Sequence, residues 1–275
     1  MLPSRFVLPP GPREGLVLNL ASMRLFYFPK PAPGAPAEVI THPIGIGREG
    51  WLTPQGTMHI IQKKEKPAWT VPESVRREHA EQGETLPKIV PPGPDNPLGD
   101  FAMRLSNPSY LIHGTNQPYG VGIRVSHGCV RLYPEDIARL FPLVPMGTPV
   151  RIINEPYVAG WRDGQLYLEA HQPLAEDAER WNGSLEPMER TVAAKTNGQS
   201  IGVSWEKARA IAREARGLPL PIAPGSPELA ELLAKAPQVP SVPPWAVPVE
   251  EGAEAVQDAA SADELADNQS SLPPS

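Results

Sequence analysis

The chain has 275 residues, 40% of them hydrophobic and 20% charged, which is typical of a globular protein with many loops. Its 37 prolines and 23 glycines exclude a mostly helical fold, because an interior proline removes a backbone donor and clashes with the preceding turn. A net charge of −6 without a Lys/Arg run argues against nucleic acid as a partner, and no apolar run reaches the length of a membrane span.

Alternating and continuous apolar runs predict β-strands along most of the first 170 residues. Residues 15–28 read as a hairpin that turns at Ala21, Ser22 and Met23. Further strands are predicted at residues 38–47, 56–65, 100–105, 110–112, 148–154 and 157–170, the last of them turning at Asp163 and Gly164. The proline-rich residues 86–99 predict no regular element and suit a functional loop or flap.

Three short helices are predicted among these strands. Residues 72–83 open with a proline and close at Gly83, and residues 133–141 carry apolar side chains on one face. Residues 204–217 begin at a capping serine, Ser204, and end at Gly217. Composition and patterning therefore predict a mainly β fold with a few short helices and a disordered Pro/Ala/acidic tail over residues 223–275. With the resemblance described below, the ordered part is expected to divide into a domain over residues 1–156 and a hairpin and helix subdomain over residues 157–222.

One stretch, YLIHGTNQPYGVGIRVSHGCVRLYPEDIARLF, contains the only cysteine, Cys129. A thiol is nucleophilic only as thiolate, and an adjacent imidazole can take its proton and later return it to a leaving amine. His127 shares a face with Cys129 in an extended chain, and His113 ends a separate strand that could pair beside the cysteine strand. The residues alone leave both histidines open as the base.

The neighbours of Cys129 suit acyl transfer through a thioester. Gly128 would leave the backbone N–H groups of residues 128 and 129 free to face an oxyanion, and Arg131 can bind a carboxylate in a bidentate manner. One alternative to a catalytic role is a buried, inert cysteine. Another is a zinc site formed by His113, His127 and Cys129, but the spacing matches none of the common zinc patterns, so no metal and no cofactor is expected.

The same residues resemble the catalytic signature of the bacterial L,D-transpeptidases, the YkuD-type domain, and especially its ErfK/YbiS subgroup. In that family a histidine precedes Ser/Thr-His-Gly-Cys by roughly fourteen to seventeen residues, and an apolar residue and Arg or Asn follow. His113, Ser126, His127, Gly128, Cys129, Val130 and Arg131 fill every position. The resemblance extends over about residues 6–156, with segments such as HPIGIGREGWLTPQGT and VPPGPDNPLGDFAMRL, and weakens through about residue 221.

The resemblance implies a β-sandwich-like fold and a thiol acyltransferase acting on peptidoglycan stem peptides. Cys129 would attack the carbonyl between the third residue and D-Ala, D-Ala would leave, and an acceptor amine of a second stem or a lipoprotein lysine would resolve the thioester. The roles implied are base and acid for His113, ring orientation for the Gly114 carbonyl, the oxyanion site for the N–H groups of Gly128 and Cys129, and substrate positioning for Ser126, His127 and Arg131.

Two other functions stay open: an L,D-carboxypeptidase or endopeptidase that uses water as acceptor, and a non-catalytic wall-binding module. Related proteins carry an export signal before the segment at which this chain starts, and residues 1–15 show none. We therefore expect missing N-terminal sequence and a periplasmic or extracytoplasmic protein, from the implied substrate alone.

Overall fold

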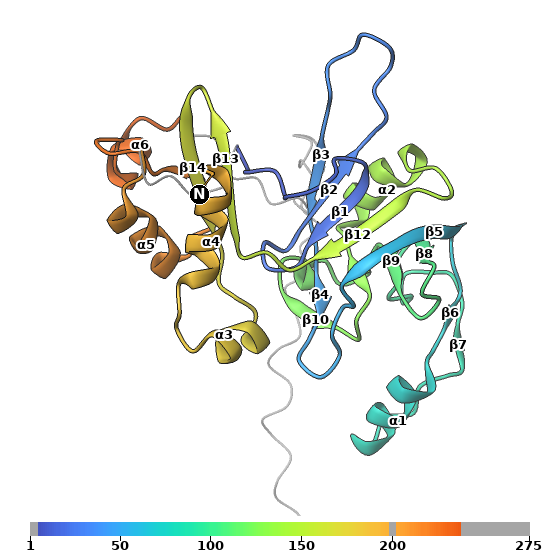
Figure 1. Cartoon of the computed structure of the whole chain (residues 1–275). Helices are drawn as coiled ribbons and strands as arrows, with labels where there is room; N and C mark the ends of the chain where they lie inside the picture. The colour runs from blue at the N-terminus through green and yellow to red at the C-terminus, as the bar shows by residue number, and fades with distance from the viewer. Residues whose placement is uncertain (1–4, 198–201, 238–275) are drawn as a thin grey trace, which may run out of the picture. The chain divides into compact units, whose positions relative to one another are not determined.

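An eight-stranded sheet dominates the structure, a computed structural model that describes residues 5–197 and 202–237 (Figure 1). In spatial order its strands are β11 (Val130–Arg131), β9 (Leu111–His113), β8 (Phe101–Leu105), β5 (Gly56–Glu65), β12 (Pro149–Ile153), β1 (Gly15–Asn19), β2 (Arg24–Phe28) and β3 (Ile40–Pro43). Two pairs, β1–β12 and β9–β11, are parallel and the others are antiparallel. The mainly β prediction is confirmed.

The sheet curls until its two ends share hydrogen bonds. Gly45, just beyond β3 at one end, exchanges two 2.9 Å N–H···O bonds with Arg131 of β11 at the other. A small parallel ribbon of β4 (Ile46–Gly47) and β10 (Arg124–Ser126) continues this contact. A side chain at Gly45 cannot be accommodated, because its Cβ would lie 2.2 Å from the carbonyl oxygen of Gly120.

One face of the sheet forms the hydrophobic core with α2 (Pro134–Leu143). Ile137, Leu140 and Phe141 of this helix are buried, as their spacing predicts. They pack with a cluster that includes Ile112 of β9 and Val130 of β11, both almost completely buried. The strands that carry the histidine and the cysteine are therefore anchored by their core-facing residues.

The connection between β5 and β8 forms an arm. It contains β6 (Trp69–Thr70), α1 (Glu73–Glu81) and β7 (Ile89–Val90), and β6 and β7 pair as an antiparallel ribbon with α1 at its end (Figure 1). The predicted helix is present, with Gly83 at a φ of 82° just beyond it. The prediction of no regular element in 86–99 missed the two-residue β7, which lies before the prolines at 91 and 92.

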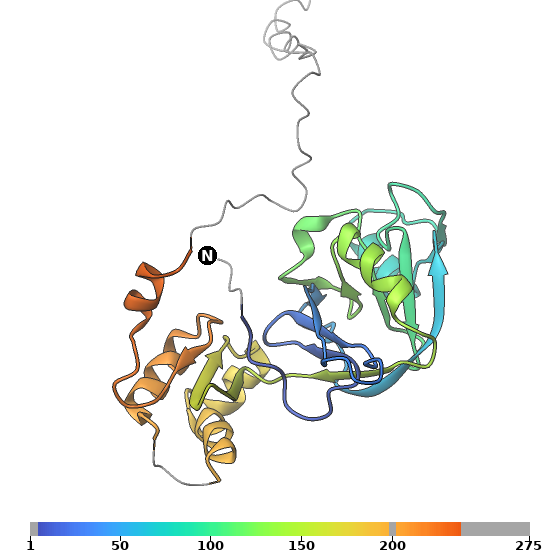
Figure 2. The same ribbon diagram turned by 90° about the horizontal axis from the view of Figure 1, so that it is seen from above.

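The C-terminal part is a three-stranded sheet with helices against it (Figure 2). Its elements are β13 (Tyr157–Arg162), β14 (Gln165–Ala170), β15 (Leu220–Pro221), α3 (Ala175–Trp181), α4 (Glu186–Lys195) and α5 (Trp205–Glu214), and a further helix, α6 (Leu229–Ala234), follows in the chain. Asp163 and Gly164 turn the hairpin with φ of 49° and 73°, and Ser204 caps α5 by accepting from Lys207 N–H at 3.3 Å. Helix α5 ends at Glu214, with Ala215 after it at a φ of 45°, rather than at Gly217, and α3 and α4 were not predicted.

The described residues up to Leu229 group as one compact unit, and polar contacts cross the predicted boundary at residue 156. The Glu169 carboxylate accepts from Val7 N–H at 2.7 Å, and Arg124 forms an ion pair with Glu176. The division into 1–156 and 157–222 stays a prediction, and residues 238–275 of the predicted tail lie outside the described residues. No described helix is long and apolar enough to cross a membrane.

Burial of Ile112 generates a stability prediction. Ile112→Ala should lower the free energy of unfolding by about 2–5 kcal/mol in urea titration, because it leaves a cavity beside His113. Ile61→Ala on β5 is the matched control, since this side chain is 46% exposed and its loss should change stability by no more than about 0.5 kcal/mol. Equal effects of the two changes would contradict the placement of the core.

Candidate active site

Cys129 lies immediately before β11, beside the strand that ends at His113. The parallel register pairs Val130 with Ile112 and Arg131 with His113. Because paired residues share a face of a sheet, His113 and Arg131 lie together on the face opposite the buried pair. The predicted pairing of the histidine strand with the cysteine strand is present. A further hydrogen bond, from the Leu132 N–H to the His113 carbonyl at 2.9 Å, extends it.

The thiol of Cys129 is partly exposed, and its Sγ lies 3.9 Å from the carbonyl oxygen of Ser109. Burial raises the pKa of the thiol, while a hydrogen bond from the Leu111 backbone and the charges of Arg131 and Arg104 act in the opposite direction. The group therefore rests as a thiol. Within the described residues it makes no hydrogen bond to His113, a contact that in ligand-free enzymes often tightens only when substrate binds.

His113 is buried, with 3% of its surface exposed. Its Nδ1 lies 2.6 Å from the Gly114 carbonyl oxygen, which can only accept, so Nδ1 carries the proton and Nε2 is left as the proton acceptor. Burial lowers the pKa of His113 to about 3, helped by the charge of Arg131 and opposed by the backbones of Gly114 and Leu98. The ring is thus a neutral imidazole with a fixed tautomer, and the orienting role of Gly114 stays a prediction to which this contact lends support.

His127 is held in a separate polar cluster. Its Nε2 lies 2.7 Å from Oε2 of Glu78 on α1 and 3.1 Å from Nη2 of Arg48, and Trp51 packs edge-on against its ring at 4.8 Å between centroids. Hydrogen bonds from Arg48 and His127 lower the pKa of Glu78, so the carboxylate is ionised and accepts the Nε2 proton. This Nε2 therefore already carries a proton and cannot accept one, which favours His113 for the role of the base.

The turn through Ser126 and Gly128 differs from the prediction. The Gly128 N–H, expected to face an oxyanion, donates instead to Ser126 Oγ at 3.1 Å. Ser126, expected to contact substrate, is buried, and its hydroxyl donates to the Cys129 carbonyl at 2.5 Å. Ser126 therefore braces the turn, and the Cys129 N–H remains without a hydrogen-bond partner among the described residues.

The backbone conformation at position 128 requires glycine. Its φ is 102°, and a Cβ there would lie 2.7 Å from the ring of Tyr110. Its carbonyl accepts from Thr53 Oγ1 at 3.0 Å, and Gly47 N–H donates to the same hydroxyl at 2.9 Å. The turn that carries Cys129 is thus fixed from several sides, which limits movement of its thiol.

Arg131 faces the thiol without an anionic partner. It forms no ion pair with any described residue, and its buried Nε has no hydrogen-bond partner. Burial lowers its pKa, and proximity to Cys129 and Tyr119 raises it. An unpaired, half-buried guanidinium is a site that a substrate carboxylate can neutralise.

Several residues around the site gave no signal in the sequence. Glu78, Arg48 and Thr53 are common residue types far from the motif, and only the folded chain brings them to it. Arg104 and a pocket beside it are equally unforeseen. The described residues contain no group of three or more His, Cys, Asp or Glu side chains able to hold a metal ion.

Comparison with known proteins gives consistent matches. A family model of the L,D-transpeptidase catalytic domain matches residues 13–152. The probable L,D-transpeptidases ErfK/SrfK of Escherichia coli K12 and Salmonella typhimurium LT2 are each 39% identical to this chain, over 83% of it and 73% and 74% of their own lengths. The probable L,D-transpeptidase YbiS of Escherichia coli K12 is 43% identical over 71% of this chain and 63% of its own length.

The lowered pKa of His113 predicts a pH dependence of stability. The unfolded ring binds a proton below about pH 6.5 whereas the folded ring does not, so stability should fall as the pH drops from about 6.5 toward 3. Between pH 7 and pH 5 this group alone should remove about 2 kcal/mol from the free energy of unfolding. His113→Asn should flatten the profile by that amount in urea titrations, and an unchanged slope would show that the folded ring is protonated normally.

The bracing role of Ser126 predicts a stability loss. Ser126→Ala should cost about 1–3 kcal/mol in urea unfolding, because a buried N–H loses its acceptor. Ser106→Ala, which removes an exposed hydroxyl that accepts from His59 N–H at 3.2 Å, should stay within about 0.5 kcal/mol. Undiminished stability with a raised KM for substrate would instead restore the predicted contact to substrate.

Proposed function

Because the chain belongs to the L,D-transpeptidase catalytic domain family, we propose that Cys129 transfers the acyl group of a peptidoglycan stem peptide to an amine. Members of this family are peptidoglycan-modifying transferases. The observation that carries the assignment of residues is the pairing of β9 with β11, which sets a neutral histidine of fixed tautomer beside the thiol.

The first half-reaction forms a thioester. His113 Nε2 takes the thiol proton as Sγ attacks the carbonyl carbon between residue three and D-Ala of a tetrapeptide stem. Because the thiol has a raised pKa and the ring a lowered one, a resting ion pair is disfavoured, and proton transfer accompanies the attack. The C–N bond then breaks, and the proton passes from His113 to the leaving amine of D-Ala.

The oxyanion of the tetrahedral intermediate needs a hydrogen-bond donor close to Sγ. The N–H of Cys129 is free for this role, whereas the N–H of Gly128 donates to Ser126. Gly128 then contributes through its backbone conformation. Arg131 supplies positive charge on the same face and takes a substrate carboxylate.

His127 acts indirectly on this site. Its hydrogen bond to Glu78, which also pairs with Arg48, ties the arm that carries α1 to the turn that carries Cys129. The arm is the segment between β5 and β8, so this cluster fixes one wall of the substrate groove. His127 is a positioning residue in this proposal.

The second half-reaction releases the acyl group to an amine. The acceptor is the side-chain amine of a second stem, which gives a 3→3 cross-link, or the lysine of a wall-anchored lipoprotein. The amine loses its proton to His113 as it attacks, and the thiol is restored. Since peptidoglycan lies outside the cytoplasm, the proposal places the protein in the periplasm or another extracytoplasmic space.

Mass spectrometry of the reaction with a disaccharide-tetrapeptide, with and without a second stem, tests the function. The chain should release D-Ala and form a cross-linked dimer. Cys129→Ala should abolish both, and His113→Ala should slow turnover on the order of 10²–10⁴-fold through loss of the base. His127→Ala should be less damaging than His113→Ala, and His59→Ala, at an exposed position of β5, should leave turnover unchanged.

The other outcomes are equally informative. Tripeptide as the sole product, even with an acceptor stem present, would identify a carboxypeptidase that uses water. Absence of an acyl-enzyme together with normal stem binding would indicate a wall-binding module. A larger loss with His127→Ala than with His113→Ala would reverse the roles of the two histidines.

A further inference from the structure

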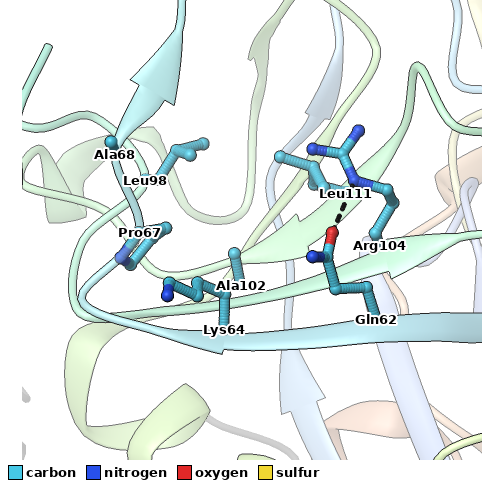
Figure 3. A pocket seen from close by; sticks show the side chains of 8 residues that line it. All are labelled: Gln62, Lys64, Pro67, Ala68, Leu98, Ala102, Arg104 and Leu111. Atoms are coloured by element: carbon cyan, nitrogen blue, oxygen red, sulfur yellow. Dashed lines mark hydrogen bonds between the residues drawn. The ribbon is translucent and has the colours of Figure 1, made fainter. Parts of the chain in front are cut away.

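A pocket is lined by side chains of β5, β8 and β9, the last of which is the strand that ends at His113 (Figure 3). Its volume is about 270 Å³, and it is lined by Gln62, Lys64, Pro67, Ala68, Leu98, Ala102, Arg104 and Leu111. The lining includes two cations and no carboxylate. None of these residues was singled out by the sequence motif.

Strand register places this pocket on the same face as the catalytic residues. Lys64 of β5 pairs with Ala102 of β8, and Ala102 pairs with His113 of β9. Arg104 is in register between Gln62 and Leu111. Since directly paired side chains share a face, the pocket continues the catalytic surface across β9, β8 and β5.

Arg104 is held in place for binding. Its Nε donates to Gln62 Oε1 at 3.1 Å, a bond drawn in Figure 3, and its Nη1 donates to the Pro108 carbonyl at 2.5 Å. Pro108 lies in the turn that also presents the Ser109 carbonyl to the thiol. The remaining guanidinium donors have no hydrogen-bond partner among the described residues, so a planar carboxylate can bind them.

The charge of the pocket is unusual for this chain. Neither Arg104 nor Lys64 forms an ion pair with any described residue, although the chain as a whole has a net charge of −6. The floor formed by Ala102 and Leu111 is small and apolar, which leaves room above it for a ligand. Two free cations over an apolar floor favour an aliphatic group that ends in a carboxylate.

We propose that Arg104, assisted by Lys64, forms a specificity subsite for a free carboxylate of the donor stem peptide. The inference rests on the proposed function, and it predicts that the enzyme discriminates against stems in which this carboxylate is amidated. Arg104 lies two strand spacings from the cysteine strand, roughly 10 Å. This distance suits a carboxylate on residue two of the stem or at the end of the residue-three side chain.

Calorimetric binding to the full chain carrying Cys129→Ala tests the subsite without turnover. Three synthetic tetrapeptides serve as probes: one with all carboxylates free, one amidated at residue two, and one amidated on the residue-three side chain. Arg104→Gln should weaken binding of the free stem on the order of ten-fold, and Lys64→Gln by less. Arg139→Gln, which removes an exposed charge from α2, should leave binding unchanged.

The amidated stems identify the carboxylate. The stem whose amidation weakens binding to the unsubstituted pocket should show no further loss with Arg104→Gln, and this stem reveals which carboxylate is bound. The proposal would be overturned if Arg104→Gln weakened the binding of all three stems equally, or of none. An equal loss for all three would mean that Arg104 only supports the turn at Ser109. Arg104→Lys, which keeps the charge, should recover part of the affinity and guards against misfolding of the glutamine variant.

The same measurements separate this subsite from the reaction. If the unsubstituted enzyme fails to release D-Ala but the Cys129→Ala chain still prefers the free carboxylate through Arg104, the proposed function is wrong and the subsite is correct. If D-Ala is released and KM is indifferent to both amidation and Arg104→Gln, the function stands and the subsite does not.

Discussion

The parallel pairing of β9 with β11 is the constraint on which the site depends. It places the strand of His113 beside the residue that follows Cys129, although sixteen positions separate the two in sequence. The Gly45 bridge to Arg131 closes the sheet on the other side of β11. Because β11 is hydrogen-bonded to β9 on one side and to Gly45 on the other, its register cannot shift easily. The side chains of Cys129 and Arg131 therefore point to one face of the sheet.

Desolvation decides the electrostatics of this face. It moves the pKa of the thiol upward and that of the imidazole downward, which favours the neutral form of each group. Arg131 and Arg104 act on the thiol in the opposite direction, but their effect is smaller than that of burial. A neutral thiol and imidazole flanked by two arginines suit a substrate rich in carboxylates, since the substrate supplies the negative charge that the resting site lacks.

The two histidines illustrate how identical residue types acquire different roles. His113 has a carbonyl on Nδ1 and no described anion beside it, whereas His127 has an ionised carboxylate on Nε2. Glu78 reaches the second ring from α1, about fifty residues earlier in the chain. The arm and the catalytic turn are therefore coupled through a histidine inside the signature motif itself.

The sequence by itself determined the mainly β class, the helices near residues 72–83 and 204–217, and the family, because strand periodicity, capping residues and the SHGC motif are local signals. The tertiary structure decided what depends on distant partners. In the folded chain the Gly128 N–H donates to Ser126, and His127 contacts Glu78. Arg104 and Lys64 line one pocket on the same face of the sheet as His113. Helices α3 and α4 also escaped prediction. Contacts of this kind arise from strand register and packing, which no local pattern of residues encodes.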